Sequence, residues 1–185
     1  MLDVFSELNR RGSEYILILV CRENEWKDFE HPCKNAPWLE VHHTSGNGLV
    51  ELYKRASVAF NVGSSSYEYS RFAISVKVFD YLDNCDCFVL VSRYETFGVV
   101  FAESMYCGKP VIANATGGPD SFINKKNGIL VSVENIDETA AALDFVLNNY
   151  RQFDSEYIRG FAKENFAPDV ICKQLYNVYR EVINK

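Results

Sequence analysis

One segment near the middle of the sequence, residues 85–119, most strongly constrains the fold. Residues 87–91 form a continuous apolar run, too short for a buried helix and bounded by polar residues, which is typical of a parallel strand covered on both faces. A helical pattern begins at Gly98 and ends at Gly108 and Pro110, and residues 111–113 are a second apolar strand. The segment therefore predicts a parallel sheet with helices packed on it.

The same alternation of strands and helices runs through the rest of the chain. No two strands are joined as a hairpin, which favours a doubly wound α/β sheet with helices on both faces. The terminal helix is expected to turn Val170, Ile171, Leu175, Val178, Tyr179 and Val182 inward. Further strands are predicted at 15–20, 38–42, 58–62 and 128–131, and further helices at 2–12, 48–56, 72–82, 135–147, 154–163 and from 168 onward.

Composition excludes several classes of function. The net charge of −6 and the pI near 5.1 argue against nucleic acid and anionic membrane as general partners. The six cysteines and three histidines have no metal-binding spacing, so we expect no metal site and interpret the cysteines as reduced core thiols of a cytoplasmic protein. The N-terminus lacks a signal-peptide pattern, and the apolar run at 15–21 is too short to span a bilayer.

Two loops should face one binding site. In open parallel sheets, ligands bind outside the carboxyl ends of the strands, so residues 92–97 and 114–118 are expected to meet there. Free N–H groups around 97–100, at the start of a helix, suit a phosphate. The carboxylates of Glu95 and Glu103 suit vicinal hydroxyls, because they only accept hydrogen bonds. A nucleotide sugar carries hydroxyls on its sugar, a diphosphate, and vicinal hydroxyls on its ribose, so these protein groups together match a nucleotide sugar. Either glutamate alone would more often be a solvated surface residue.

The run S-R-Y-E-T-F-G-V-V-F-A-E-S-M-Y-C-G-K-P-V-I-A-N-A-T-G-G-P carries a family resemblance. It resembles the E-x7-E region of retaining glycosyltransferases of family 4, the glycosyl transferases group 1 type, and the resemblance extends from Asp83 to about Ile183. It implies the donor-binding half of a GT-B fold, moving a sugar from a UDP- or GDP-linked donor to a glycan or lipid-linked acceptor, as in polysaccharide biosynthesis. The resemblance further implies that the transfer retains the configuration at the sugar and needs neither a metal nor a separate cofactor.

Carried over by position, the resemblance makes Glu95 the candidate catalytic residue, in contact with the donor's sugar hydroxyls, and assigns Glu103 to the ribose. Three residues depart from the family pattern: Val91 replaces a usual Pro, Thr96 a frequent Gly, and Ser104 a frequent Ala. Neither carboxylate is lost through these changes. The other expected donor-binding residues are Ser92, Thr96, Phe97, Gly98, Val99, Gly117 and Gly118.

The N-terminal half departs further from the family. The family's donor domain begins with a strand whose loop carries a basic pair for the diphosphate, whereas this sequence starts at the helix after it and passes twice through a helix–strand unit. We interpret residues 51–84 as an extra unit and suspect two glycosyltransferase-like pieces joined near Asn84. If strand 58–62 fills the missing central place, the six strands take the flavodoxin-like order 2-1-3-4-5-6. Arg71, or otherwise Lys77, would then replace the missing basic pair as the cation for the diphosphate. Either side chain could instead simply be solvated.

The competing functions belong to other classes. A nicotinamide-binding domain would need G-x-G-x-x-G after the first strand, and residues 19–24 contain no glycine. A non-catalytic nucleotide-sugar-binding or structural module is the stronger alternative, because the family's second, acceptor-holding domain is not recognised in these residues. We therefore expect residues 1–185 to form a single donor domain that is inactive without a partner domain.

Overall fold

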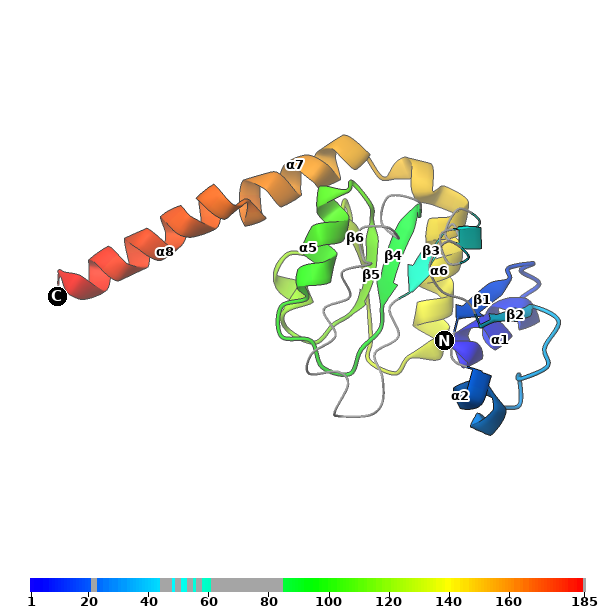
Figure 1. Ribbon diagram of the computed structural model, residues 1–185. Helices are drawn as coiled ribbons and strands as arrows, with labels where there is room; N and C mark the ends of the chain where they lie inside the picture. Colours follow the sequence, from blue (N-terminus) through cyan, green and yellow to red (C-terminus); the bar gives the residue numbers. More distant parts are fainter. Residues whose placement is uncertain are drawn as a thin grey trace.

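A computed structural model of the chain describes residues 1–20, 23–43, 48, 51–52, 55, 58–60 and 85–184. Helices and parallel strands alternate along them, as the sequence predicts (Figure 1). The strands are β1 (Leu17–Val20), β2 (Leu39–His42), β3 (Val58–Phe60), β4 (Cys87–Leu90), β5 (Val111–Asn114) and β6 (Gly128–Val131). The helices are α1 (Leu2–Arg10), α2 (Glu23–Asp28), α5 (Val99–Tyr106), α6 (Ile136–Asn149), α7 (Ser155–Phe166) and α8 (Pro168–Ile183), with short 3₁₀ turns η1 (Pro119–Ser121) and η2 (Tyr150–Gln152).

The larger sheet has four parallel strands in the order β3-β4-β5-β6. Every residue of β4 and β5 is buried. Side chains alternate between the two faces of a strand, so Phe88 and Leu90 pack into one core cluster while Cys87 and Val89 pack into the other. The prediction of a strand covered on both faces is thus confirmed.

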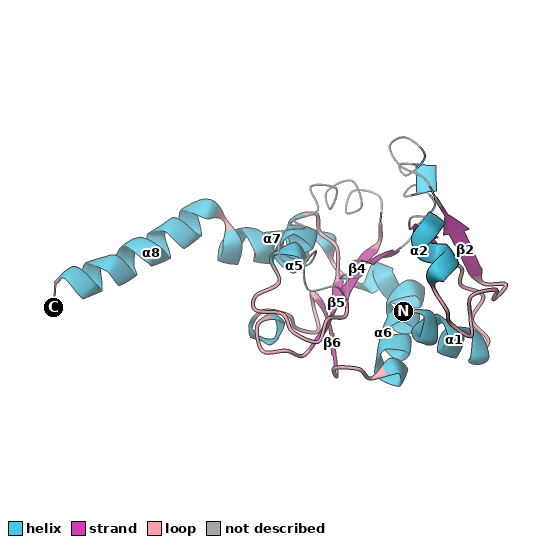
Figure 2. Cartoon of the chain, turned by 60° about the horizontal axis from the view of Figure 1, so that its bottom comes forward, coloured by secondary structure: helices cyan, strands magenta, loops and turns pink. Residues whose placement is uncertain are grey.

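Different helices cover the two faces of this sheet (Figures 1 and 2). On one face, α5 and α7 contribute Phe101, Met105 and Ile158 to the core cluster. On the other face, α1 and α6 contribute Leu8 and Leu143. The arrangement is the doubly wound α/β architecture expected from the sequence.

The six strands do not form one sheet, which corrects the expected order 2-1-3-4-5-6. β1 and β2 pair only with each other among the described residues, and β3 pairs with β4 but not with β1. The small sheet is instead attached through side chains, because Leu17 of β1 joins the cluster that contains Cys87 and Val89. In the described part of the chain, β3 therefore lies at an edge of the larger sheet, and the idea that strand 58–62 fills a central place fails.

Two helices begin with side-chain caps. The Asn135 side chain accepts a hydrogen bond from the Glu138 amide at the start of α6. Asp154 accepts from the amides of Glu156 and Tyr157 at the start of α7. Both caps satisfy N–H groups that would otherwise lack partners.

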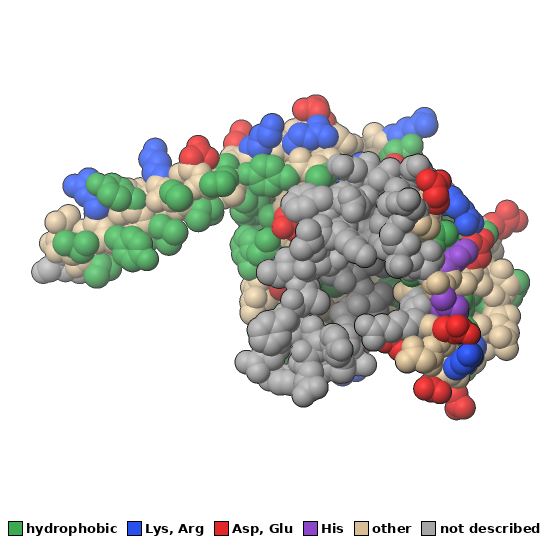
Figure 3. All heavy atoms as spheres, in the orientation of Figure 1, with side chains coloured by type: hydrophobic (Ala, Val, Ile, Leu, Met, Phe, Trp, Pro, Cys, Tyr) green, Lys and Arg blue, Asp and Glu red, His purple; other side chains and the backbone are tan. Residues whose placement is uncertain are grey.

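Helix α8 corrects a second expectation, that its apolar residues face inward. The helix extends away from the body of the molecule (Figure 1), and no residue of it is buried. Figure 3 shows apolar side chains gathered along it, and Leu175 and Val182 are 50% and 66% exposed. Among the described elements α8 packs mainly against α7, and its apolar side chains stay largely exposed.

The cysteines in the described residues form no disulfides, in agreement with the expected reduced thiols. Cys85 and Cys87 are buried, and burial raises the pKa of the Cys87 thiol well above its usual value. Cys172, on α8, is exposed, so not every cysteine is a core thiol. None of the described helices is long and apolar enough to cross a membrane.

A buried hydroxyl in α5 provides a test of the packing. Ser104 is fully buried, and its Oγ has no hydrogen-bond partner among the described residues. Because an unpaired buried hydroxyl is costly and alanine favours a helix, Ser104→Ala is expected to stabilise the fold by about 1 kcal/mol in chemical denaturation. The control is Ser121→Ala, which removes a hydroxyl that donates to the Gly118 carbonyl and should not stabilise. A destabilised Ser104→Ala variant would show that the hydroxyl has a partner.

Candidate functional site

The loops that follow β4 and β5 meet, as the sequence predicts. The Thr116 hydroxyl lies 3.5 Å from the Glu95 carbonyl oxygen. Gly118 approaches the backbone of Thr96 so closely that a Cβ at this position would overlap the Thr96 carbonyl oxygen. Glycine at 118 is therefore what allows the two loops to pack against each other.

The loop after β6 is attached to the same edge of the sheet. Arg93, in the loop after β4, forms a 2.5 Å ion pair with Glu134. Asn114, the last residue of β5, donates from Nδ2 to the Ser132 carbonyl oxygen at 3.0 Å. The carboxyl ends of three neighbouring strands thus carry loops that are linked to one another.

Helix α5 begins at this edge with an open N-terminus. Gly98 is the N-cap, in the left-handed conformation with φ of 81°, and no side chain caps the helix. The amides of Val99 and Val100 donate to no described residue. These N–H groups, together with the positive end of the helix dipole, are suited to bind an anion.

Glu95 lies beside this N-terminus. Its Oε1 accepts a hydrogen bond from the Thr96 amide at 3.0 Å, and its side-chain stem lies next to Gly98, within 3.3 Å of where a Cβ would be. The other carboxylate oxygen has no partner among the described residues. It is free to accept from a ligand.

Glu103 lies further along α5 and is half-buried. Its carboxylate forms no ion pair or hydrogen bond with the described residues. Burial raises the pKa of Glu103 above its usual value. A half-buried carboxylate without a donor is costly for the free protein, and a ligand hydroxyl would relieve that cost.

The remaining expected site residues fall into two groups. Ser92, Thr96, Phe97, Gly98 and Val99 lie between the end of β4 and the start of α5, and Gly117 and Gly118 lie in the adjoining loop. Gly117 has a left-handed φ of 101°, and its amide donates to Asp120. Arg71 and Lys77, the candidate cations, lie outside the described residues, as does most of the interpreted extra unit 51–84.

Sequence reasoning missed the residues that join the loops. Asn114 is 5% exposed and ends an otherwise apolar strand, but it was expected to lie in a loop. A polar residue directly after a buried strand was the available signal. Nothing in the sequence indicated the Arg93–Glu134 pair. No group of His, Cys, Asp and Glu residues in the described ranges could hold a metal ion.

The raised pKa of Glu103 predicts a stability effect with a defined sign. A carboxyl whose pKa rises on folding destabilises the folded state at every pH above its folded-state pKa, and the cost disappears as pH falls through the two pKa values. Glu103→Gln should therefore raise Tm at pH 7, and the gain should shrink as the pH falls to about 4.

Thermal melts across this pH range test the effect, with Glu164→Gln, at an exposed position on α7, as the matched control. The control should show no such pH-dependent gain. A Tm that falls for Glu103→Gln at pH 7 would mean that the native carboxylate has a stabilising partner.

Comparison with known proteins places the segment that contains this site in a family. Residues 70–162, about half of the chain, match the family described as glycosyl transferases group 1. The matched segment includes both glutamates, and it runs across Asn84, the suspected junction.

Curated relatives agree with this match. An uncharacterised glycosyltransferase of Methanocaldococcus jannaschii is 37% identical over 52% of this chain and 26% of its own length. A probable sucrose-phosphate synthase of Thermosipho melanesiensis is 27% identical over 84% of this chain and 32% of its own length. The chain thus spans only about a quarter to a third of these relatives.

Solved structures share the fold. Sucrose-phosphate synthase from Thermosynechococcus elongatus superposes with a TM-score of 0.61 at 20% identity, covering 99% of this chain and 42% of that chain. Anabaena HepE, solved in complex with UDP and glucose, superposes with a TM-score of 0.56 at 18% identity, covering 96% of this chain and 52% of that chain. From the family match over half of its length, this chain belongs to the glycosyl transferases group 1 family.

Proposed function

We propose that the chain is the donor-binding part of a glycosyltransferase and binds a nucleotide sugar at the carboxyl edge of β4 and β5. The observation that carries the proposal is the uncapped N-terminus of α5, with Glu95 in the loop before it and Glu103, which has no partner among the described residues, in the same helix, all within the family's matched segment. Anabaena HepE, which shares the fold, has been solved with UDP and with UDP-glucose. These complexes favour a UDP-linked donor over a GDP-linked one.

The amides of Gly98, Val99 and Val100 are proposed to bind the donor's diphosphate. Their N–H groups and the α5 dipole supply positive partial charge in a protein with a net charge of −6. Gly98 has no side chain to shield these amides, and a Cβ there would overlap the Phe101 ring. Arg71, expected from the sequence to add a full charge, remains a proposal.

The two carboxylates are proposed to bind hydroxyls at opposite ends of the diphosphate. Glu95, fixed by the Thr96 amide, would accept from the sugar and act at the reacting end. Glu103 would accept from the ribose and gain hydrogen bonds that no described residue supplies. Following the family resemblance, we propose sugar transfer with retention and without a metal, to a glycan or lipid-linked acceptor, in a cytoplasmic setting.

The acceptor is proposed to be held by a second domain that packs on α8. The helix exposes large apolar side chains, among them Leu175, Val178, Tyr179 and Val182. Burying one such side chain stabilises a complex by roughly 1.5–3 kcal/mol, so this face favours a firmly docked partner. Transfer needs both reactants in one geometry, and we therefore expect donor binding without transfer by residues 1–185 alone.

The donor site is tested by comparing two variants with UDP and UDP-glucose in calorimetry. Glu95→Ala should weaken UDP-glucose by roughly 1.5–3 kcal/mol, about ten- to a hundredfold, and leave UDP unchanged, because only the sugar contact is lost. Glu103→Ala should weaken both ligands. Glu164→Ala is the matched control and should bind both like the parent chain.

If both glutamate variants bind UDP-glucose as the parent does, the site assignment is wrong. A turnover assay separates the catalytic proposal from its alternative, a non-catalytic nucleotide-sugar-binding module. Transfer that arises only when an acceptor domain is supplied supports the enzyme. Donor binding that never leads to transfer, even with that domain, supports the module.

A further inference from the structure

Helix α7 packs against α5 (Figure 1) and contacts residues at both of its ends. Just after the last turn of α5, the Cys107 carbonyl oxygen accepts a hydrogen bond from the Arg159 guanidinium at 3.2 Å. At the other end, Phe166, the last residue of α7, lies beside Phe97, which directly precedes the N-cap of α5. The second half of α7 therefore runs antiparallel to α5 and ends at the turn that is proposed to bind phosphate.

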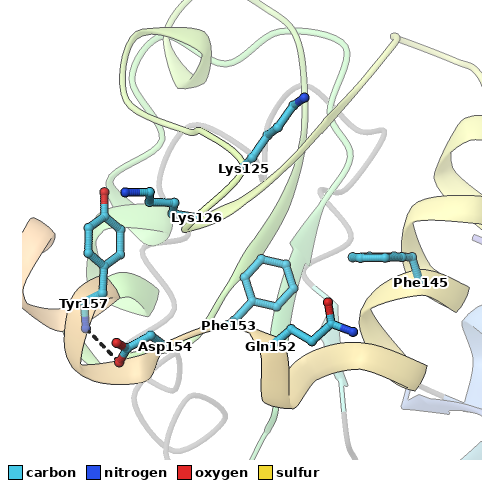
Figure 4. A pocket seen from close by; sticks show the side chains of 7 residues that line it. All are labelled: Lys125, Lys126, Phe145, Gln152, Phe153, Asp154 and Tyr157. Atoms are coloured by element: carbon cyan, nitrogen blue, oxygen red, sulfur yellow. Dashed lines mark hydrogen bonds between the residues drawn. The ribbon is translucent and has the colours of Figure 1, made fainter.

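The rest of α7 is held firmly in place. At its start, the Asp154 carboxylate accepts a hydrogen bond from the Tyr157 amide at 3.1 Å, drawn in Figure 4, and another from the Glu156 amide. Ile158 and Ala162 are fully buried in the core cluster on this face of the sheet. A helix fixed by its cap and by a close-packed buried face holds its last residue at a defined position.

Three phenylalanine rings join the end of α7 to the donor loop. Phe166 lies edge-on to Phe97, with ring centres 5.7 Å apart, and edge-on to Phe122 at 5.2 Å. Phe97 and Phe122 also contact each other, with ring centres 5.1 Å apart. Phe122 is 7% exposed, whereas Phe97 is 41% exposed and lies in a loop. Contact with the two other rings is thus what fixes the Phe97 side chain.

The position of Phe97 restrains the anion-binding turn. Gly98 follows it directly in the left-handed conformation, and glycine has more backbone freedom than any other residue. The peptide bond between the two residues is planar, so a fixed Phe97 limits how the Gly98 turn can move. We infer that Phe166 is a positioning residue, which holds the first turn of α5 through Phe97 in the geometry that binds phosphate. The inference rests on the proposed nucleotide site.

Calorimetry with UDP on the full chain tests this role. Phe166→Ala should weaken UDP about three- to tenfold, the range expected for the loss of one edge-to-face ring contact. Phe161→Ala is the matched control and should bind UDP like the parent chain. Phe161 is half-buried on the same helix and contacts Phe166, but among the described ring contacts it has none with Phe97. Phe166→Leu should also weaken UDP, and it replaces the alanine variant if that variant does not fold.

A double variant shows whether Phe166 acts through Phe97. Phe97→Ala alone should weaken UDP, and adding Phe166→Ala should weaken it no further, because the contact between the two rings is already lost. The free energy of unfolding should still fall further in the double variant, since Phe166 also packs against Phe122 and Phe161. A merely structural role would make the losses of UDP affinity additive.

Hydrogen exchange in the free chain gives a readout that does not depend on UDP. The Phe101 amide donates to the Gly98 carbonyl oxygen at 2.9 Å, so its exchange reports on the first turn of α5. Phe166→Ala should speed this exchange by more than its loss of global stability explains, and Phe161→Ala should not. If the parent chain does not bind UDP, the proposed nucleotide site fails, and the exchange at Phe101 alone decides whether Phe166 positions the turn.

Four results would overturn the positioning role. Phe166→Ala could leave exchange at the Phe101 amide unchanged, or it could leave the UDP affinity unchanged in a chain whose parent binds UDP. Phe161→Ala could have the same effects as Phe166→Ala. The losses of affinity in the double variant could add.

Discussion

Two strands with no exposed residue, β4 and β5, determine how the rest of the molecule is arranged. Their side chains alternate between the two faces, so helices must cover both, α5 and α7 on one and α1 and α6 on the other. Parallel strands also place their carboxyl ends at one edge. The loops after β4, β5 and β6 therefore meet there, and the candidate donor site lies among them.

The parts of the fold that the sequence predicted are those determined locally. The strand at 87–91 and the helix after Gly98 each depend on residues a few positions apart, and both are present. The grouping of strands into sheets depends on distant contacts. β1 is attached by packing of Leu17 rather than by hydrogen bonds to β3, which no periodicity in the sequence reveals.

Helix α8 illustrates the same limit. The apolar residues from Ile171 to Val182 recur at helical spacing, but this spacing does not say what covers them, and the expectation that they face inward is wrong. In the site, the positions of Glu95 and Glu103 followed from loop and helix spacing. The raised pKa of Glu103 could not be predicted from this spacing, because it comes from burial of the carboxylate.

The account rests on the claim that the open α5 N-terminus binds the phosphates of a nucleotide. Amide NMR of the chain during titration with UDP tests this claim most directly. The account predicts that the largest saturable shifts occur at Gly98, Val99 and Val100, whose amides donate to no residue in the described part of the chain. Shifts confined to other surfaces, or no saturable shift at these three amides, would contradict it.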